Sequence, residues 1–251
     1  MQMYDWFITK KHPKYIQSIL ARSNKNILEH LLTFFKANQT LSILEIGPGK
    51  GYFYQATRRF RSRIAYHAFD RNKVMLKNLG ISKIYHGEAS KLVHFKKKFH
   101  IIYAAYVIEH LKDGIAVFEM IKNCKKYLHK DGIIVFIAPN TITQGMEFWN
   151  SDYTHTYPTT KRNVSMAFHD NGITDISIFE FNDMALWLTG DSGLWIWIVR
   201  VCQILFFFYN YRITHMIFSF IYTKKEYDLD SALFRLYLFS KAQNLMFIAR
   251  P

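Results

Sequence analysis

Cysteine is scarce in this chain of 251 residues. Only Cys124 and Cys202 are present, and they lie far apart in unlike contexts. This excludes both a disulfide framework and a zinc site of clustered thiolates. The first residues lack an apolar core followed by small residues, so we expect no secretory signal and a cytoplasmic protein. The sequence also lacks internal repeats and low-complexity linkers, so no firm domain boundary can be placed.

Acidic residues are also few, with 19 Asp and Glu against 33 Lys and Arg and a formal net charge of +14. This balance favours an anionic partner, which could be nucleic acid, an anionic membrane surface or a phosphorylated acceptor. Charge alone does not choose among them. Half of the residues are hydrophobic, which excludes a disordered chain.

An uninterrupted apolar run is missing even from the most hydrophobic segment, residues 194–222. Arg200 and Arg212 divide it, whereas a membrane-spanning helix needs about 20 mostly apolar residues. An arginine near the bilayer centre costs roughly 2.5–3.5 kcal/mol, so we expect no span. Aromatic residues with scattered arginines suit a helix lying in the membrane interface, and Lys224 and Lys225 would add attraction to anionic lipid. A dimer interface or a lid over the core explains the same pattern equally well.

Strand-like and helix-like segments alternate after the first forty residues, which are themselves predicted to be helical. The alternation predicts an α/β protein with a parallel sheet covered on both faces. We expect strands at 42–46, 64–69, 81–85, 99–103, 132–138, 173–181 and 244–250. Helices are expected at 52–60, 73–78, 114–128 and 161–170, with Lys130-Asp131-Gly132 closing the third of these. Residues 182–241 form an insertion before the last strand.

A glycine-rich turn follows the first expected strand, where residues 41–52 read LSILEIGPGKGY. Gly47, Gly49 and Gly51 allow a sharp bend and a close approach of a ligand to the main chain. The helix that follows presents free N–H groups at its start. A dinucleotide fingerprint would need its third glycine at position 52, where this chain has Tyr52.

The pattern Glu45-x-Gly47-x-Gly49-x-Gly51 resembles motif I of class I S-adenosylmethionine (SAM)-dependent methyltransferases, where this turn cradles the amino acid end of SAM. The resemblance covers about residues 41–181 and resumes in the last strand. It implies SAM as the cofactor. It also implies a Rossmann-like seven-stranded sheet in the order 3-2-1-4-5-7-6, with a helical hydrophobic insertion between the last two strands. The corresponding parts are an N-terminal helical segment (1–40), the SAM-binding core (41–181), the insertion (182–241) and a final strand (242–251).

Asp70 ends the second expected strand, at the distance from the glycine turn that one βαβ unit requires. A carboxylate there can accept both ribose hydroxyls of a nucleoside, although it could instead cap the next helix. The resemblance places Glu88 against the adenine amino group and the backbone N–H of Ala89 against the ring. An ordinary surface loop is the alternative for these two residues.

The fourth expected strand runs into Tyr106-Val-Ile-Glu-His110. In the family, the backbone at Ala104 and Tyr106 passes the methionine part of SAM. The tail resembles a segment of the methyltransferases of polysaccharide-biosynthesis clusters and of ubiquinone-type O-methyltransferases. Glu109 and His110 could hold a divalent metal, as in some quinone relatives, but a carboxylate and one imidazole are an incomplete ligand set. We therefore expect no metal here and assign the pair to capping and orienting the next helix.

Residues 148–158 read FWNSDYTHTYP after Pro139-Asn140, and they resemble the substrate loop of glycan-associated methyltransferases. An alcohol loses its proton as it is methylated, and a histidine is suited to accept it. We predict His155 as this base, oriented by Asp152. Trp149, Tyr153 and Tyr157 form either a stacking wall for a sugar or aromatic ring, or only the packing of the loop.

These features predict a methyltransferase that O-methylates a sugar hydroxyl or a related group in surface-glycan biosynthesis. The acceptor would be a small molecule or a lipid-linked glycan, with peripheral membrane contact through 194–222 at the inner face of the membrane, and a homodimer as another role for that segment. The rivals are a quinone O-methyltransferase, an RNA methyltransferase and a SAM-binding protein without catalysis. We do not expect nucleic acid as the partner, because an Asn-Pro-Pro-Tyr motif and a recognisable RNA-binding module are both missing.

Overall fold

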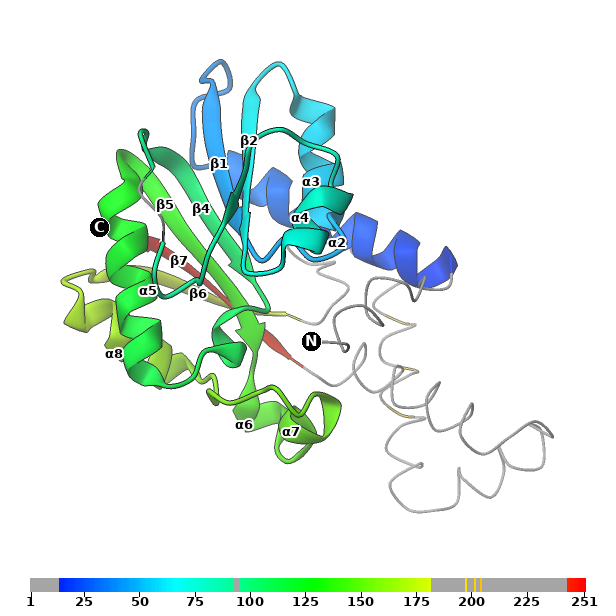
Figure 1. Ribbon diagram of the computed structural model, residues 1–251. Coiled ribbons are helices and arrows are strands. Elements are labelled where there is room, and N and C mark those ends of the chain that lie inside the picture. Colours follow the sequence, from blue (N-terminus) through cyan, green and yellow to red (C-terminus); the bar gives the residue numbers. More distant parts are fainter. Residues whose placement is uncertain (1–13, 93–94, 182–196, 198–200, 202–203, 205–242) are drawn as a thin grey trace.

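Seven strands form one sheet in the order β3-β2-β1-β4-β5-β7-β6 (Figure 1). The computed structural model describes residues 14–92, 95–181 and 243–251, with single positions at 197, 201 and 204. The strands are β1 (Leu41–Ile46), β2 (Ile64–Asp70), β3 (Ile84–His86), β4 (Phe99–Ala105), β5 (Leu128–Pro139), β6 (Asp175–Phe181) and β7 (Asn244–Arg250). The predicted fold class and strand order are confirmed.

The last strand, β7, lies between β5 and β6 and runs antiparallel to both. The pairs β1–β2, β1–β4, β2–β3 and β4–β5 are all parallel. Six of the seven residues of β7 are buried, because the strand has a neighbour on each side and helices over its faces. Residues 244–250 therefore complete the same core as residues 41–181.

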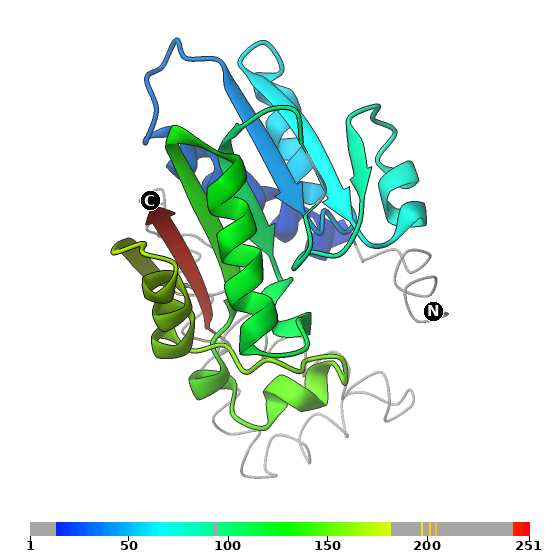
Figure 2. The ribbon, with the colours of Figure 1, turned by 60° about the vertical axis from the view of Figure 1, so that its left-hand side comes forward.

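Helices cover both faces of the sheet (Figure 2). On one face, α5 (Gly114–Tyr127) and α8 (Lys161–Asp170) share a hydrophobic cluster with β4 and β5. On the other, α2 (Lys14–Leu32), α3 (Tyr52–Thr57) and α4 (Lys73–Asn78) pack over β1 and β2. The buried side of α5 is formed by Val117, Met120, Ile121 and Cys124, whose spacing is that of one helix face.

Several element bounds differ from expectation; for example, β6 begins at Asp175 rather than at residue 173. The N-terminal helix ends at Leu32 rather than continuing to residue 40, and residues 1–13 lie outside the described chain. β3 begins at Ile84, three residues after the expected start. The helix α5 ends at Tyr127 without using Gly132 as a cap, and β5 begins at the next residue. A β-carbon on Gly132 would lie 3.0 Å from the carbonyl oxygens of both His100 and His129, so this glycine serves the irregular β4–β5 pairing instead.

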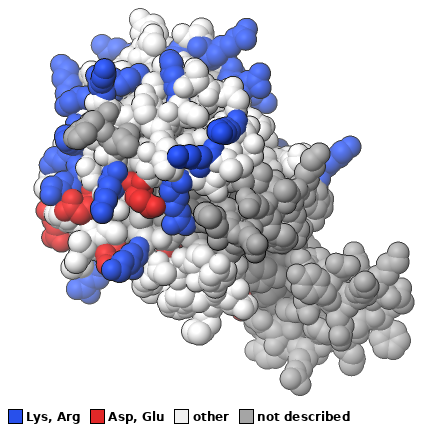
Figure 3. All heavy atoms as spheres, viewed as in Figure 1, with Lys and Arg blue, Asp and Glu red and all other residues white. Residues whose placement is uncertain are grey.

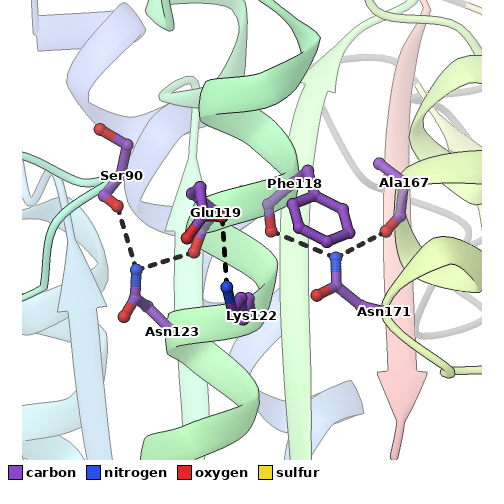
Figure 4. Close-up of polar contacts among 7 residues, drawn as sticks. All are labelled: Ser90, Phe118, Glu119, Lys122, Asn123, Ala167 and Asn171. Atoms are coloured by element: carbon purple, nitrogen blue, oxygen red, sulfur yellow. Dashed lines mark hydrogen bonds and ion pairs between the residues drawn. The ribbon is translucent and has the colours of Figure 1, made fainter.

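Two asparagines connect the loops and helices of the α5 face (Figure 4). Asn123 Nδ2 donates to the carbonyls of Ser90, at 3.0 Å, and Glu119, at 2.8 Å, so the loop after β3 is tied to α5. Asn171 Nδ2 donates to the carbonyls of Phe118 and Ala167, which ties the end of α8 to α5. These bonds fix the loop that carries Glu88 and Ala89.

Most of the predicted insertion, residues 182–241, lies outside the described part of the chain. The described exceptions are Trp197, Val201 and Ile204, which are helical and 66, 50 and 58% exposed. Within the parts of the chain that the structure describes, no helix is long and apolar enough to cross a membrane.

Glu45 is a carboxyl group inside the core, in the middle of the sheet. Its side chain is 4% exposed and accepts a hydrogen bond from the hydroxyl of Tyr66 on β2. Burial raises the pKa of Glu45 to about 8; the bond from Tyr66 opposes this shift and the charge of Asp70 adds to it. The native chain therefore keeps a proton on Glu45 at pH values where the unfolded chain has lost it.

This proton predicts a pH-dependent contribution to stability. Between pH 4.5 and about 8 the native state binds this proton more tightly than the unfolded state does, which stabilises the native state. This contribution to the free energy of unfolding declines as the pH rises through that window. The variant Glu45→Gln removes the titration. Relative to the unmodified chain, its free energy of unfolding should increase by at least about 1 kcal/mol between pH 5 and pH 8 in urea titrations. Glu119→Gln, on the exposed face of α5, is the control and should show no such trend; equal trends in the two variants would contradict the assignment.

Candidate functional site

The glycine turn lies directly against the turn that follows β4. Gly47 has φ = 70°, a conformation that glycine adopts without strain, and its amide donates to the carbonyl of Phe69 at 2.9 Å. A β-carbon on Gly47 would lie 2.5 Å from Cγ2 of Val107, so only glycine permits this approach. The first turn of the cofactor motif and the tail of β4 are thereby held together.

Gly49, at the outer part of the same turn, faces open space. Its φ is 52°, and an added β-carbon would meet no atom of the described chain within 4 Å. A cavity of about 220 Å³ opens beside it, lined by Gly49, Lys50, Met75, Asn78 and Leu79. The main chain at Gly49 is therefore accessible to a ligand, as the motif requires.

Asp70 is the last residue of β2, and its Oδ1 accepts from the amide of Asn72 at 2.7 Å. The helix α4 is capped by Asn72, whose side chain accepts from Val74 and Met75. Asn72, and not Asp70, therefore caps α4. Burial raises the pKa of Asp70, the Asn72 amide opposes this shift, and the charge of Glu88 adds to it.

The loop after β3 places Glu88 near Asp70. The amide of Gly87 donates to the carbonyl of Asp70 at 3.1 Å, so the two strand ends lie side by side. Glu88 is exposed, whereas Ala89 is half-buried against the core. Both acidic groups therefore stand at the carboxyl ends of neighbouring parallel strands, where ligands bind in such sheets.

Tyr106, just beyond β4, has the backbone conformation expected at a ligand site. With φ = 57° it is the one non-glycine residue of the described chain in the left-handed region, and its amide donates to the carbonyl of Ile137 at 2.8 Å. The Tyr106 side chain is 45% exposed. Ala104, by contrast, is 1% exposed, so its side chain belongs to the core and only its backbone could meet a ligand.

Glu109 lies in the short helix η2 (Ile108–His110) and is 1% exposed. Neither of its carboxylate oxygens has a hydrogen-bond partner among the described residues. Burial raises its pKa to about 8; the backbone amide of Glu109 itself opposes this shift, and the charge of Asp152 adds to it. The expected capping role is wrong, because the carboxylate that caps α5 is that of Asp113, which accepts from Ala116.

The loop predicted to bind substrate is docked onto η2 by backbone and side-chain hydrogen bonds. The amides of Thr156 and Tyr157 donate to the carbonyl of Glu109 at 2.9 and 3.0 Å. The Thr156 hydroxyl donates to the carbonyl of Leu111 at 2.7 Å. Residues 154–157 are therefore fixed beside the turn that Gly47 contacts through Val107.

His155 is oriented by Phe148 rather than by Asp152. Its Nδ1 lies 2.6 Å from the carbonyl oxygen of Phe148, an acceptor only, so Nδ1 carries the proton and Nε2 has the lone pair. Asp152 Oδ1 instead accepts from the amide and hydroxyl of Thr154 at 2.8 and 2.7 Å. The expected side-chain bond between Asp152 and His155 is not formed; the two residues are joined through the backbone, where the amide of His155 donates to the carbonyl of Asp152 at 3.1 Å.

His110 completes a cluster that the sequence did not reveal. Its Nδ1 lies 2.8 Å from the Thr154 hydroxyl. One potential ligand atom each from Glu109, His110 and His155 lies within 4.8 Å of the others. The sequence contains the pair Glu109-His110, but His155 is 45 residues further on. Its spacing from the pair does not indicate that its loop folds back beside them.

The three aromatic residues of the loop divide between the two predicted roles. Trp149, in α7 (Glu147–Ser151), is 43% exposed and Tyr153 is 79% exposed, so both are accessible to an acceptor. Tyr157 is 9% exposed and belongs to the core cluster, where burial raises the pKa of its hydroxyl. Tyr157 therefore packs the loop.

Among solved structures, a SAM-dependent methyltransferase from Archaeoglobus fulgidus is 20% identical, with a TM-score of 0.56 over 90% of this chain and 92% of that one. Phosphoethanolamine N-methyltransferase 2 from Haemonchus contortus, solved with phosphomonomethylethanolamine and S-adenosylhomocysteine, is 17% identical with a TM-score of 0.57; the match covers 90% of this chain and 52% of that one. A sarcosine dimethylglycine methyltransferase from Galdieria sulphuraria is 11% identical with a TM-score of 0.59, covering 91% and 85%. At these identities the likeness shows the fold.

Among curated proteins, none matches the chain. The family model described as "Methyltransferase domain" matches residues 16–178, well over half of the sequence. This range contains the glycine turn, Asp70, the loop after β3 and the cluster around Glu109. The chain therefore belongs to the methyltransferase domain family and is a methyltransferase that uses SAM as its methyl donor.

Proposed function

We propose that this methyltransferase O-methylates a hydroxyl of a sugar or a related small molecule in surface-glycan biosynthesis. The observation that carries the proposal is the position of His155. The loop that carries His155 is hydrogen-bonded to η2, and η2 directly follows Val107, the residue that Gly47 contacts. Nε2 of His155 has a free lone pair. In this proposal Nε2 of His155 accepts the proton of an alcohol bound beside the glycine turn, as transfer to an alcohol requires.

In the donor site, the main chain at Gly47, Gly49 and Gly51 would receive the amino acid end of SAM. Asp70 would accept the ribose hydroxyls with its carboxylate, which also accepts from the amide of Asn72. Glu88 and the amide of Ala89 would contact adenine, and the strained backbone at Tyr106 would pass the methionine part. Glu45 accepts a hydrogen bond from Tyr66 in the core, so it would stabilise the start of the turn rather than contact SAM.

The transfer itself is an in-line displacement. A lone pair of the acceptor oxygen attacks the methyl carbon, the carbon–sulfur bond breaks, and S-adenosylhomocysteine leaves with that electron pair. The acceptor proton passes to Nε2 of His155. Because the sulfonium carbon is already electrophilic, the protein contributes mainly alignment and this proton acceptor.

The acceptor would lie against the exposed rings of Trp149 and Tyr153. Aromatic faces of this kind suit the apolar face of a sugar or a quinol ring, so a quinone O-methyltransferase is the main alternative. A small acceptor is in keeping with the Haemonchus contortus enzyme, whose complex contains phosphomonomethylethanolamine. Glu109 and His110 lie beside the loop that carries His155, which favours hydroxyl chemistry over a bare SAM-binding role.

A lipid-linked acceptor would place the enzyme at the inner face of the membrane. Trp197, Val201 and Ile204 support this, because their spacing puts them on one side of a helix and all three are exposed. Contact with a second copy of the chain would use the same apolar side. On the face seen in Figure 3, Lys and Arg are spread widely and acidic residues gather on the side where α5 lies, which favours general attraction to anions over a nucleic-acid groove.

The ribose contact is tested by Asp70→Asn. Removing the charge from this hydrogen-bond acceptor should weaken binding of S-adenosylhomocysteine about tenfold to a hundredfold in calorimetry, since hydrogen bonds to charged groups contribute about 1.5–3 kcal/mol. Asp175→Asn, which alters the exposed pair with Arg250, is the control and should bind normally. Unchanged affinity in the Asp70 variant would refute the assignment.

The accessible glycine is tested with a matched pair, Gly49→Ala and Gly80→Ala. Both glycines have positive φ and open surroundings, so both substitutions should cost about 1–2 kcal/mol of stability. The Gly49 variant alone should lose affinity for S-adenosylhomocysteine, at least about tenfold, because its methyl group occupies the ligand's approach. Equal affinities in the two variants would show that the ligand does not approach Gly49.

The reaction is tested by offering nucleotide sugars, simple glycosides, a catechol and a primary amine with SAM, and measuring S-adenosylhomocysteine and the methylated product. We expect transfer to a sugar hydroxyl, with kcat lowered about 10²–10⁴-fold in His155→Ala and affinity for S-adenosylhomocysteine retained. His129→Ala, remote on β5, is the control. Transfer confined to the amine, or undiminished turnover in the His155 variant, would contradict the proposal.

A further inference from the structure

An open groove lies between α3 and α4, on the face of the sheet that α2 also covers. Its volume is about 570 Å³, and it extends from Lys50 and Gly51 in the glycine turn to the residues that follow α3. Tyr54 lines it, and the ring of Tyr54 packs 4.8 Å from that of Tyr66 on β2. At the end of α4, Leu79 lies so close that a β-carbon on Gly51 would be 2.7 Å from its Cδ2. The walls of the groove are therefore held by the core.

The groove is lined by four cations and, among the described residues, by no acidic one. Lys50 comes from the glycine turn, Arg58 and Arg59 from the short helix η1 (Arg58–Phe60), and Arg61 from the turn after it. Two exposed amide side chains, one on α3 and one at the end of α4, add hydrogen-bond donors. Cations that converge from separate segments create a local positive potential that attracts anions.

The three arginines of this groove differ from the next arginine along the chain, which stabilises the fold. Arg63 donates to the carbonyls of Gln39, at 3.1 Å, and Lys36, at 2.8 Å. The groove arginines are exposed, and their side chains have neither a hydrogen bond nor an ion pair with another described residue. Their guanidinium groups therefore keep their paired N–H donors available for an anion, and that geometry matches phosphate oxygens.

From this groove we infer that the protein binds a diphosphate group between α3 and α4, at a site separate from the donor and acceptor sites. Lys50 and Arg61 lie at opposite ends of the helical segment, roughly 15 Å apart along its axis. Their long side chains can reach inward from the two ends, so two linked phosphates engage the four cations better than a single phosphate does. The inference goes beyond the proposed function, because it involves neither His155 nor the acceptor hydroxyl.

Binding is tested by calorimetry on the full chain with inorganic pyrophosphate. We expect one pyrophosphate per chain, with an affinity that falls as salt is added, because exposed charges are screened. The double variant Arg58→Gln, Arg59→Gln should bind at least about tenfold more weakly, since it loses hydrogen bonds between charged groups. The double variant Lys96→Gln, Lys98→Gln removes the same charge from exposed positions before β4, and as the matched control it should bind normally.

A second double variant, Arg58→Lys, Arg59→Lys, tests the geometry of recognition. It keeps both charges and loses the planar donor groups, so its affinity should lie between those of the unmodified chain and the glutamine variant. Affinity for S-adenosylhomocysteine should be retained in every variant, which shows that each is folded.

Phospholipid headgroups present phosphates of the same chemistry, so sedimentation with vesicles of phosphatidylglycerol and phosphatidylcholine distinguishes the two sources. Stoichiometric pyrophosphate binding that is weakened only in the arginine variants supports the soluble diphosphate. Vesicle binding that is lost in the glutamine variant, without stoichiometric pyrophosphate binding, overturns it and assigns the groove to lipid.

Two other results would also overturn the inference and leave the methyltransferase function intact. Equal loss of pyrophosphate affinity in the arginine and lysine double variants would show only general attraction to a basic chain. Displacement of pyrophosphate by saturating S-adenosylhomocysteine would place the anion in the donor cavity rather than in a separate groove.

Discussion

The contact between Gly47 and Val107 is the constraint on which the site depends. It brings the turn after β1 against the turn after β4, at a distance that only a glycine permits. Parallel pairing of β1 with β4 places both turns at one edge of the sheet, and the contact removes the remaining freedom between them. The glycine turn and the segment that leads into η2 are thereby held against each other.

The second element of that arrangement is the docking of residues 154–157 onto η2. These bonds satisfy backbone groups of both segments, so the loop has a defined position although it lies far along the chain from η2. The docking also buries Glu109 beneath the loop, which is costly for a carboxylate unless a proton or a cation accompanies it. The same contacts thus fix the position of the loop and create the buried environment of Glu109.

Much of this could be predicted from local pattern. The strands, the glycine turn and the position of Asp70 at the end of β2 follow from alternation, turn residues and the spacing of one βαβ unit, all of which act over short distances along the chain. The sheet order followed from the family resemblance. Local pattern also explains the errors: Gly132 resembles a helix cap in sequence, and its real role depends on carbonyl groups of two strands.

The side-chain partners could not be predicted, because they depend on long-range packing. Asp113 rather than Glu109 caps α5, Phe148 rather than Asp152 orients His155, and Tyr157 is in the core while Trp149 and Tyr153 are exposed. The meeting of Glu109, His110 and His155 depends on how one loop folds back onto another. The spacing of these residues along the sequence does not indicate that the two loops meet.

The central claim is that the glycine turn, Asp70 and the loop after β3 bind one nucleoside ligand. Hydrogen exchange measured by mass spectrometry, with and without saturating S-adenosylhomocysteine, tests it directly. We predict slower exchange in peptides covering residues 47–51, 70–72 and 88–90, with exchange in β6 unchanged. Unchanged exchange in those three regions, or protection confined to other parts of the chain, would contradict the account.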